Sequence, residues 1–347
     1  MPKALSKTPS FAKRLVAWQK QHGRHDLPWQ SHSDPYCVWL SEIMLQQTQV
    51  VTVKAYYDKF LKRFPTVAAL ASASLDEVLG LWSGLGYYSR AKNLHRCAQR
   101  VMSEHGGIFP SSKEGLQALP GIGPSTAAAI ASLCFSHREA ILDGNVKRVL
   151  TRVHGFGHDL SVTSHEKALW QIAQDMLPQQ ESDMPTYTQG MMDLGATLCT
   201  RSRPACERCP MQDMCTAHHE GQASHYPVKS RKLKRSAQAM WLLFARSAKG
   251  AVWLQQRPPK GVWASLFTFP IFESEEVLLA SLSTPLQRKL QFAPAFVHVL
   301  THKDLHLHVA HLALPAEQSL GDAGLWWGAQ DWPNLGLPAP VRQLLLA

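Results

Sequence analysis

The chain has 347 residues and a formal net charge of +10 at pH 7. This length allows two or three domains with cores of their own, and the basic balance indicates a polyanionic partner, although charge alone does not distinguish nucleic acid from a membrane surface. Lysines interrupt the N-terminal apolar positions and no apolar run approaches the roughly twenty residues that span a bilayer, so we expect neither a signal peptide nor a membrane span. A cytoplasmic protein is predicted, associated with the nucleoid if the source is bacterial.

Hydrophobic periodicity predicts helices up to about residue 198. Helical patterns cover Phe11–Gln21, Tyr36–Val50, Val53–Arg63, Leu75–Leu81, Ser89–Glu104, 145–156, 164–177 and 186–198. Asp34 and Pro35 supply an N-cap and a first-turn proline for the second of these helices. No strand-like alternation occurs before about residue 238, so an all-α region is expected.

The helix Tyr36–Val50 combines an apolar face with polar groups suited to DNA. Glu42 is adjacent to the apolar face, which is formed by Tyr36, Trp39, Leu40 and Ile43. Gln47 and Thr48 follow within two turns, among further uncharged amides. Uncharged side chains of this kind are unusual on a helix face that only contacts solvent, and they are well suited to hydrogen bonding with base edges.

The segment Gly84–Tyr88 places two glycines before two tyrosines. This composition predicts a bent loop that presents aromatic rings. Tyrosines packed in the core and a wedge that intercalates between bases are both compatible with it.

Residues Pro120, Gly121, Ile122 and Gly123 predict a tight turn between a helical pattern that ends at Leu119 and a helix that begins at Ser125. Gly121 and Gly123 supply backbone freedom for this turn. The unpaired N–H groups at the helix N-terminus form an anion site. Because no phosphate-loop lysine motif is near, we expect a backbone phosphate rather than a free nucleotide; an ordinary helical hairpin is the alternative.

Asp143 precedes an apolar pattern at helical spacing, formed by Val146, Val149, Leu150 and Val153. This pattern predicts that Asp143 is an N-cap, and capping alone explains the residue in isolation. A capping carboxylate is also held ionised by the helix dipole, so it suits stabilisation of a developing cation.

Four cysteines have the spacing C-x6-C-x2-C-x5-C, at Cys199, Cys206, Cys209 and Cys215. This cluster predicts a metal site in a reducing compartment rather than a disulfide scaffold. It can enclose a tetrahedral zinc ion or an iron–sulfur cluster, and the single C-x2-C unit favours iron–sulfur. A structural staple is the simplest role for such a cluster.

A change of period near residue 238 predicts a second, smaller domain. Residues 218–237 are basic and contain Gly and Pro, as is typical of an exposed linker. Strand patterns cover Ala239–Ser247, Ala251–Gln256 and Phe296–Leu314. We therefore expect a multidomain protein with an all-α region at 1–217 and a mixed α/β domain at 238–347.

Several motifs together resemble one family of repair enzymes. The Leu119–Gly123 turn is similar to the helix-hairpin-helix of base-excision glycosylases related to endonuclease III, and the cysteine spacing matches the loop that holds a 4Fe–4S cluster in that superfamily. Trp39–Val50, Gly84–Tyr88, Leu142–Arg148 and Met191–Ala196 resemble segments of adenine DNA glycosylases, the MutY family. The resemblance covers essentially the whole chain, the C-terminal domain more weakly. It implies a helical glycosylase body with the hairpin at 116–135 and the cluster loop at 199–215.

The resemblance implies that Glu42 is the catalytic acid and Asp143 the catalytic aspartate, supported by Asn145. Release of adenine requires a proton on the purine and stabilisation of an oxocarbenium-like sugar, which one protonated and one ionised carboxyl group provide. The base must first be flipped out of the stack. The family positions around the mispaired 8-oxoguanine, including the wedge Tyr87, correspond to Gln47, Thr48, Leu85 and Tyr87.

Ser125 separates the chain from bifunctional relatives of the endonuclease III type, which carry a lysine at this position. That lysine forms a Schiff base with the sugar and nicks the strand, and a serine cannot do so. A monofunctional glycosylase is therefore predicted, with a bifunctional glycosylase/AP lyase as the first alternative. The second alternative, a non-catalytic iron–sulfur DNA-binding protein, is disfavoured because both Glu42 and Asp143 are present.

The C-terminal domain resembles the MutT-like, Nudix-fold module with which adenine glycosylases recognise 8-oxoguanine. It lacks the acidic cluster that holds magnesium in a Nudix box, so pyrophosphate hydrolysis is not expected. The family often has Phe-Ser-His in the loop that touches the lesion, and this chain has Leu300, Thr301 and His302 there. The expected partner is double-stranded DNA with A:8-oxoguanine or A:G mispairs, bound by a monomer without a membrane.

Overall fold

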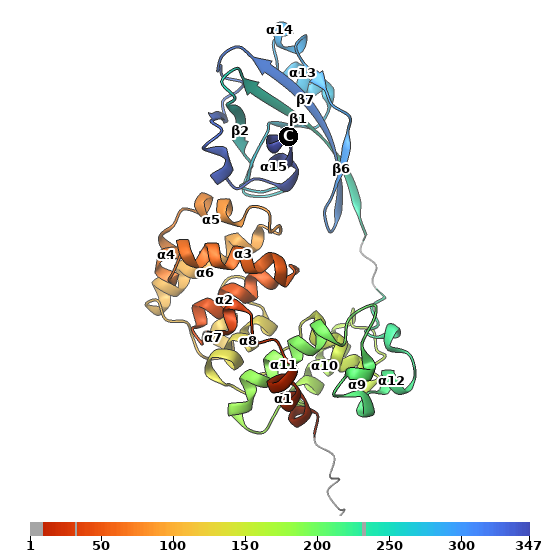
Figure 1. Cartoon of the computed structure of the whole chain (residues 1–347). Helices are drawn as coiled ribbons and strands as arrows, with labels where there is room; N and C mark the ends of the chain where they lie inside the picture. The colour runs from red at the N-terminus through yellow and green to blue at the C-terminus, as the bar shows by residue number, and fades with distance from the viewer. Residues whose placement is uncertain (1–9, 32, 231–233) are drawn as a thin grey trace, which may run out of the picture. The chain divides into compact units, whose positions relative to one another are not determined.

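A computed structural model of the chain describes residues 10–31, 33–230 and 234–347. Its contacts divide the chain into two compact units, whose elements are labelled in Figure 1. The first unit falls within residues 1–71 and 96–232, and the second joins residues 72–95 to residues 233–347. By its contacts, the helical segment 72–95 therefore belongs with the C-terminal domain.

Before residue 236, the regular secondary structure of the described residues is helical, as the periodicity predicts. The helices are α1 (Phe11–His22), α2 (Pro35–Leu45), α3 (Val50–Arg63), α4 (Val67–Ser72), α5 (Leu75–Trp82), α6 (Ser89–His105), α7 (Lys113–Gln117), α8 (Pro124–Phe135), α9 (Gly144–His154), α10 (Thr163–Asp175), α11 (Met184–Thr197) and α12 (Thr216–His219). The predicted N-cap of α2 is confirmed, because the Asp34 carboxylate accepts a hydrogen bond from the Tyr36 backbone N–H at 2.9 Å.

The helix that begins at Pro35 is shorter than predicted. It ends at Leu45 rather than Val50, because Gln46 leaves the helical region and Gln47 adopts a left-handed φ of +57°. The next helix then begins at Val50. The polar segment that includes Gln47 and Thr48 is thus a turn between α2 and α3 and not a helix face.

The core of the first unit lies between α1, α8, α9 and α11. Leu15 of α1 is fully buried beside Gly190 of α11, where an added Cβ would come within 3.1 Å of the Leu15 Cγ atom, so the crossing requires a very small residue. Ala128 and Ala129 of α8 are buried in the same cluster, as expected for small residues that let helices approach closely. This packing fixes the N-terminal ends of α8 and α9.

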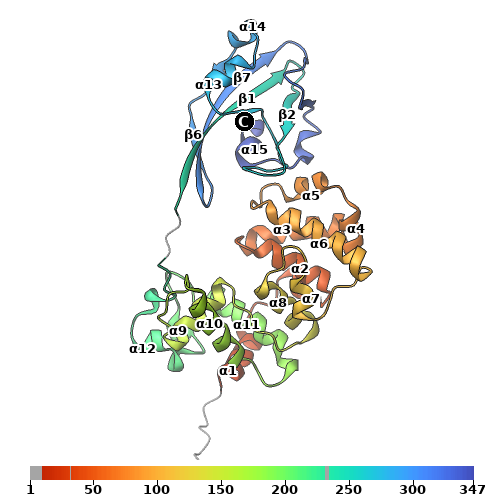
Figure 2. The same ribbon diagram turned by 180° about the vertical axis from the view of Figure 1, so that it is seen from behind.

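The C-terminal domain is built on one mixed sheet of order β3-β2-β1-β7-β5, which confirms the predicted α/β class. Its strands are β1 (Ser236–Ser247), β2 (Val252–Gln256), β3 (Phe267–Thr268), β4 (Ile271–Phe272), β5 (Gln291–Phe292), β6 (Phe296–Val299), β7 (Lys303–Leu314) and β8 (Gly324–Trp327). The long strands β1 and β7 lie side by side and parallel, from Ser236 opposite Lys303 to Ser247 opposite Leu314, as Figures 1 and 2 both show.

Short helices provide apolar residues for both clusters of this domain. They are α13 (Glu275–Ala280), α14 (Thr284–Gln287) and α15 (Ala339–Leu346). Leu278 of α13 belongs to the cluster that contains Ala310 of β7, whereas Val341 of α15 belongs to the cluster that contains Val309. Neighbouring residues of β7 therefore enter different apolar clusters, so both of its faces are packed.

The strand predicted at Phe296–Leu314 is in fact two strands. β6 and β7 pair antiparallel, with Val299 opposite Asp304, and the turn between them holds Leu300, Thr301 and His302. Four consecutive polar residues, Thr301 to Asp304, interrupt the alternation at this turn and are the signal that could have revealed it. The hairpin places Thr301 and His302 at an exposed tip.

Part of the predicted linker at 218–237 is folded. Helix α12 and a short 3₁₀ turn at Ala223–His225 occupy its start, and the Leu160 backbone N–H donates to the Val228 carbonyl at 3.0 Å. Arg231 and Lys232 of the basic run lie outside the described residues. None of the helices in the described part of the chain is long and apolar enough to cross a membrane.

The segment 72–95 contacts the C-terminal domain through α5 and the turn after it. Ser83 Oγ and Tyr88 OH both donate to the Leu337 carbonyl, at 3.1 and 2.6 Å. A Cβ on Gly80 would lie 2.0 Å from the Asn334 carbonyl oxygen, so only a glycine fits where α5 approaches the backbone of Asn334. The Gly84–Tyr88 turn is thereby held within the second unit.

Candidate active site

The first unit contains a cavity of about 430 Å³ that Glu42 lines from α2. Trp29, Ser41, Leu133 and Gln189 are among the other lining residues. Most of the lining side chains are polar or charged, so this cavity, which has the size of a small-ligand site, offers hydrogen-bonding groups to a bound ligand.

Glu42 is poised to hold a proton near neutral pH. Burial and, to a smaller extent, the negative charge of Asp143 together raise its pKa from 4.5 to about 7. That second effect shows that the two carboxyl groups are close enough to interact and that Asp143 ionises first. The structure therefore brings together the two residues that the sequence places 101 positions apart.

Asp143 caps α9, as predicted, because its Oδ1 atom accepts from the Val146 backbone N–H at 2.8 Å. The helix N-terminus favours the ionised form of this carboxyl, as expected, but burial opposes it. Burial raises the pKa of Asp143, and the N–H groups of Val146 and Asn145 oppose that rise only in part, with smaller help from Arg148. Asp143 is thus a desolvated carboxylate stabilised by backbone donors.

Asn145 supports Asp143 through its backbone, whereas its side chain points to Arg148. Arg148 Nη2 donates to Asn145 Oδ1 at 2.7 Å and to the Gly195 carbonyl at 2.7 Å. Arg148 Nε donates to the Cys199 carbonyl, also at 2.7 Å. The first turn of α9 is therefore tied to the start of the cysteine-rich segment, a link that the sequence pattern does not reveal.

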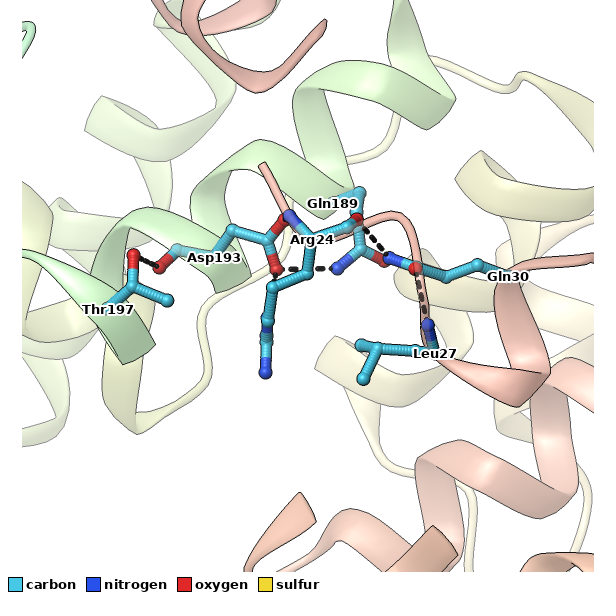
Figure 3. A network of polar contacts seen from close by, with 6 residues as sticks. All are labelled: Arg24, Leu27, Gln30, Gln189, Asp193 and Thr197. Atoms are coloured by element: carbon cyan, nitrogen blue, oxygen red, sulfur yellow. Dashed lines mark hydrogen bonds and ion pairs between the residues drawn. The ribbon is translucent and has the colours of Figure 1, made fainter. Parts of the chain in front are cut away.

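Figure 3 shows a polar network around Asp193 that sequence reasoning missed. Asp193 is fully buried and forms an ion pair with Arg24, whose Nη2 and Nε atoms each lie 2.7 Å from Asp193 Oδ1. Gln189 Nε2 donates to the same oxygen at 2.8 Å, and Gln30 Nε2 donates to the Arg24 carbonyl at 2.9 Å. Asp193 thereby fixes the orientation of the Gln189 amide, which lines the cavity.

The turn between α7 and α8 has the predicted helix-hairpin-helix form. Gly121 has a φ of +79°, which favours glycine, but Gly123 has an extended backbone and its φ of −84° is available to any residue. Among the described residues, nothing lies within 4 Å of a Cβ added to Gly123, so the turn is open where a ligand can approach. Ser125 Oγ accepts from the Leu142 backbone N–H at 3.0 Å, next to Asp143.

Of the residues expected to contact the opposite base, Gln47 and Tyr87 are exposed and Leu85 is not. Leu85 is only 6% exposed, so its side chain is part of the core, whereas Tyr87 is 44% exposed. Within the second unit, Tyr87 OH and Thr301 Oγ1 are hydrogen-bonded at 2.8 Å. The structure thus joins the tyrosine turn to the β6–β7 hairpin tip, with His302 the next residue.

The four cysteines line one pocket of the first unit together with apolar residues, and all are free of disulfides. Four cysteine thiolates in one pocket are the donor set that holds an iron–sulfur cluster. Arg152 is buried and donates from Nη1 to Cys199 Sγ at 3.3 Å, as suits a thiolate ligand. The donor set therefore fits an iron–sulfur cluster.

Comparison with known families agrees with this geometry. The profile of HhH-GPD superfamily base excision DNA repair proteins matches residues 40–175, which include Glu42, Ser125 and Asp143. The iron-sulfur binding domain of endonuclease III matches residues 199–215, and the NUDIX domain matches residues 240–347. Fold and site thus define a base excision DNA repair protein with a 4Fe–4S cluster.

Relatives that match most of the chain identify the family more specifically than the domain profiles do. The chain is 36% identical over 343 residues to an adenine DNA glycosylase of Buchnera aphidicola subsp. Acyrthosiphon pisum, with 96% of each chain covered. It is 37% identical over 382 residues to that of Mus musculus, covering 92% of this chain and 73% of the mouse protein. A solved thermostable thymine-DNA glycosylase is 29% identical with a TM-score of 0.54, covering 60% of this chain and 95% of its own. The chain belongs to the adenine DNA glycosylase family and is a DNA-binding glycosylase of base excision repair.

Proposed function

We propose that this enzyme hydrolyses the N-glycosidic bond of adenine mispaired with 8-oxoguanine or guanine and leaves the DNA strand intact. The observation that carries the proposal is the interaction of two carboxyl groups: Glu42, which lines the cavity and has a pKa of about 7, and Asp143 at the N-terminus of α9, whose charge contributes to that pKa. One of these groups holds a proton at neutral pH while the other is charged. This is the division of labour that glycoside cleavage requires.

The catalytic sequence follows from these two environments. The flipped adenine enters the cavity, and Glu42 donates its proton to the purine as the glycosidic bond breaks. The ionised Asp143 stabilises the positive charge that develops on the sugar, and its desolvation strengthens that interaction. A water molecule then adds to C1′ and loses a proton, which completes the hydrolysis and leaves an abasic site. A general acid of this kind contributes roughly 10²- to 10⁴-fold to the rate.

The cavity wall favours adenine over guanine. Gln189 donates its amide N–H to Asp193, which can only accept, so the Gln189 carbonyl oxygen Oε1 remains as the acceptor for a bound base. The 6-amino group of adenine donates a hydrogen bond to such an oxygen. Guanine presents a carbonyl oxygen at that position, and two acceptors facing each other in a desolvated site are unfavourable.

Residues outside the cavity read the opposite base. We assign contacts with 8-oxoguanine to Gln47, Thr48, Tyr87, Thr301 and His302, and a backbone contact to Leu85. The Tyr87 ring serves as a wedge beside the lesion, and the Thr301 hydroxyl takes the place of the family's serine. The helix-hairpin-helix turn, with Gly121, Gly123 and Ser125, binds the DNA backbone.

The enzyme acts as a monomer on double-stranded DNA, and its location follows that of its substrate: the cytoplasm, at the nucleoid if the source is bacterial. Ser125 lacks an amine, so the product is an abasic site and not a nicked strand. This separates the proposal from a bifunctional glycosylase/AP lyase.

Single-turnover excision on duplexes with one adenine opposite 8-oxoguanine, guanine or thymine tests the proposed specificity. We expect release from the first two duplexes, faster with 8-oxoguanine, and retention in the A:T duplex. Equal release from all three would refute mispair recognition, and no release from any of them would refute the adenine cavity.

A further inference from the structure

The turn that presents Tyr87 has an unusual backbone. Gly84, Gly86 and Tyr87 all have positive φ angles, of 105°, 72° and 47°. The two glycines adopt such angles easily, but a tyrosine rarely does, so neighbouring groups must hold it there.

Arg90, in the first turn of α6, is the group that holds this turn. Its side chain is packed under the turn, with the residue only 8% exposed, and Nη2 donates to the carbonyls of Leu85 and Gly86, at 3.2 Å each. Trp82 Nε1 donates to the same Gly86 carbonyl at 3.0 Å. Hydrogen bonds from a buried guanidinium are strong, because the charge has lost most of its water.

The same guanidinium also contacts the wedge ring. Its central carbon lies 5.5 Å from the centroid of the Tyr87 ring and 5.1 Å from that of Trp82. At the other end of the ring, the Tyr87 hydroxyl is hydrogen-bonded to Thr301, whose carbonyl accepts from Arg235 Nη1 at 3.1 Å. The ring is thus fixed at its face by Arg90 and at its hydroxyl by the β6–β7 hairpin.

We propose that Arg90 is a positioning residue for lesion recognition, which holds the 84–87 turn so that Tyr87 enters the stack beside 8-oxoguanine. The inference rests on the proposed role of Tyr87 as the wedge. Arg90 does not line the cavity that contains Glu42, so it acts on the choice of mispair and not on bond cleavage. A lysine is not equivalent, because its compact ammonium can donate to the two carbonyls that Nη2 reaches but lacks the planar group that lies over the Tyr87 and Trp82 rings.

The test is a double-mutant cycle on the full chain with its cluster, using Arg90→Met, Tyr87→Ala and the double variant. The readout is the ratio of the affinities for duplexes that carry a non-hydrolysable 2′-fluoro-adenosine opposite 8-oxoguanine and opposite guanine. We expect Arg90→Met to reduce this ratio by roughly tenfold or more, the usual effect of losing charge-assisted hydrogen bonds. In the Tyr87→Ala background the same change should have little further effect, because the ring that Arg90 positions is absent.

Matched variants separate positioning from folding. Arg90→Lys keeps the charge and should give an intermediate ratio, which also provides the measurement if Arg90→Met does not fold. Arg96→Met removes an exposed arginine from the same helix and should leave the ratio unchanged. An unchanged ratio in folded Arg90 variants, or equal losses with and without Tyr87, would overturn the proposal. A wild-type enzyme with no preference between the two mispairs would instead overturn lesion recognition itself, and Arg90's role with it.

Discussion

Replacement of Glu42 by glutamine should make the enzyme more stable and almost inactive. Burial and the charge of Asp143 raise the pKa of Glu42 from 4.5 to about 7, which corresponds to about 3 kcal/mol of native-state stability. Between these pH values the native chain binds more protons than the unfolded chain, so wild-type stability falls as pH rises through this range. Glutamine does not titrate, so Glu42→Gln should gain up to about 3 kcal/mol over wild type above pH 7 and nothing near pH 4.5.

The assay compares thermal unfolding of wild type and Glu42→Gln at pH 5 and pH 8, together with adenine release from an A:8-oxoguanine duplex. Release should fall roughly 10²- to 10⁴-fold because the proton donor is lost, while DNA binding is retained. Glu181→Gln changes an exposed carboxylate outside the cavity and should alter neither property. Near-normal release by Glu42→Gln would remove Glu42 from the mechanism, and a stability difference that does not grow with pH would refute the desolvation argument.

Other predictions follow from the same site. Wild-type excision should fall about tenfold per pH unit above pH 7, as the acid form of Glu42 is depleted, and a flat rate up to pH 9 would contradict this. Ser125→Lys should give covalent DNA that borohydride traps, whereas wild type should give none; efficient trapping by wild type would disprove the monofunctional mechanism. Freshly purified protein should contain several irons per chain and no zinc, and Cys209→Ser should lower the iron content. Asp193→Asn should lower the melting temperature strongly, by leaving Arg24 without its buried charge partner, at about 3–5 kcal/mol, and a melting temperature like that of wild type would argue against the network in Figure 3.

Local signals in the sequence were sufficient to predict most helix starts. Asp34 and Asp143 cap α2 and α9 as expected, because an N-cap is a contact between residues only two or three positions apart. Helix ends were less predictable. α2 ends before a left-handed Gln47, and a glutamine carries none of the conformational signal that a glycine would provide at that position.

The catalytic residues Glu42 and Asp143 were predictable because two long motifs contain them, but the pKa shifts of their carboxyl groups were not. The raised pKa of Glu42 depends on burial and on Asp143, which only the folded chain brings near. Arg24 with Asp193, and Tyr87 with Thr301, are contacts between residues far apart in sequence, which periodicity and capping rules do not detect. The association of segment 72–95 with the C-terminal domain was missed for the same reason.

The most direct test of the central claim measures free adenine and strand integrity in the same reaction on an A:8-oxoguanine duplex. Release of adenine should equal the number of abasic sites formed, and the strand should break only after alkali. Glu42→Gln should abolish both products together. Strand breakage by wild type without alkali, or adenine release that survives Glu42→Gln, would contradict monofunctional cleavage by the Glu42–Asp143 pair.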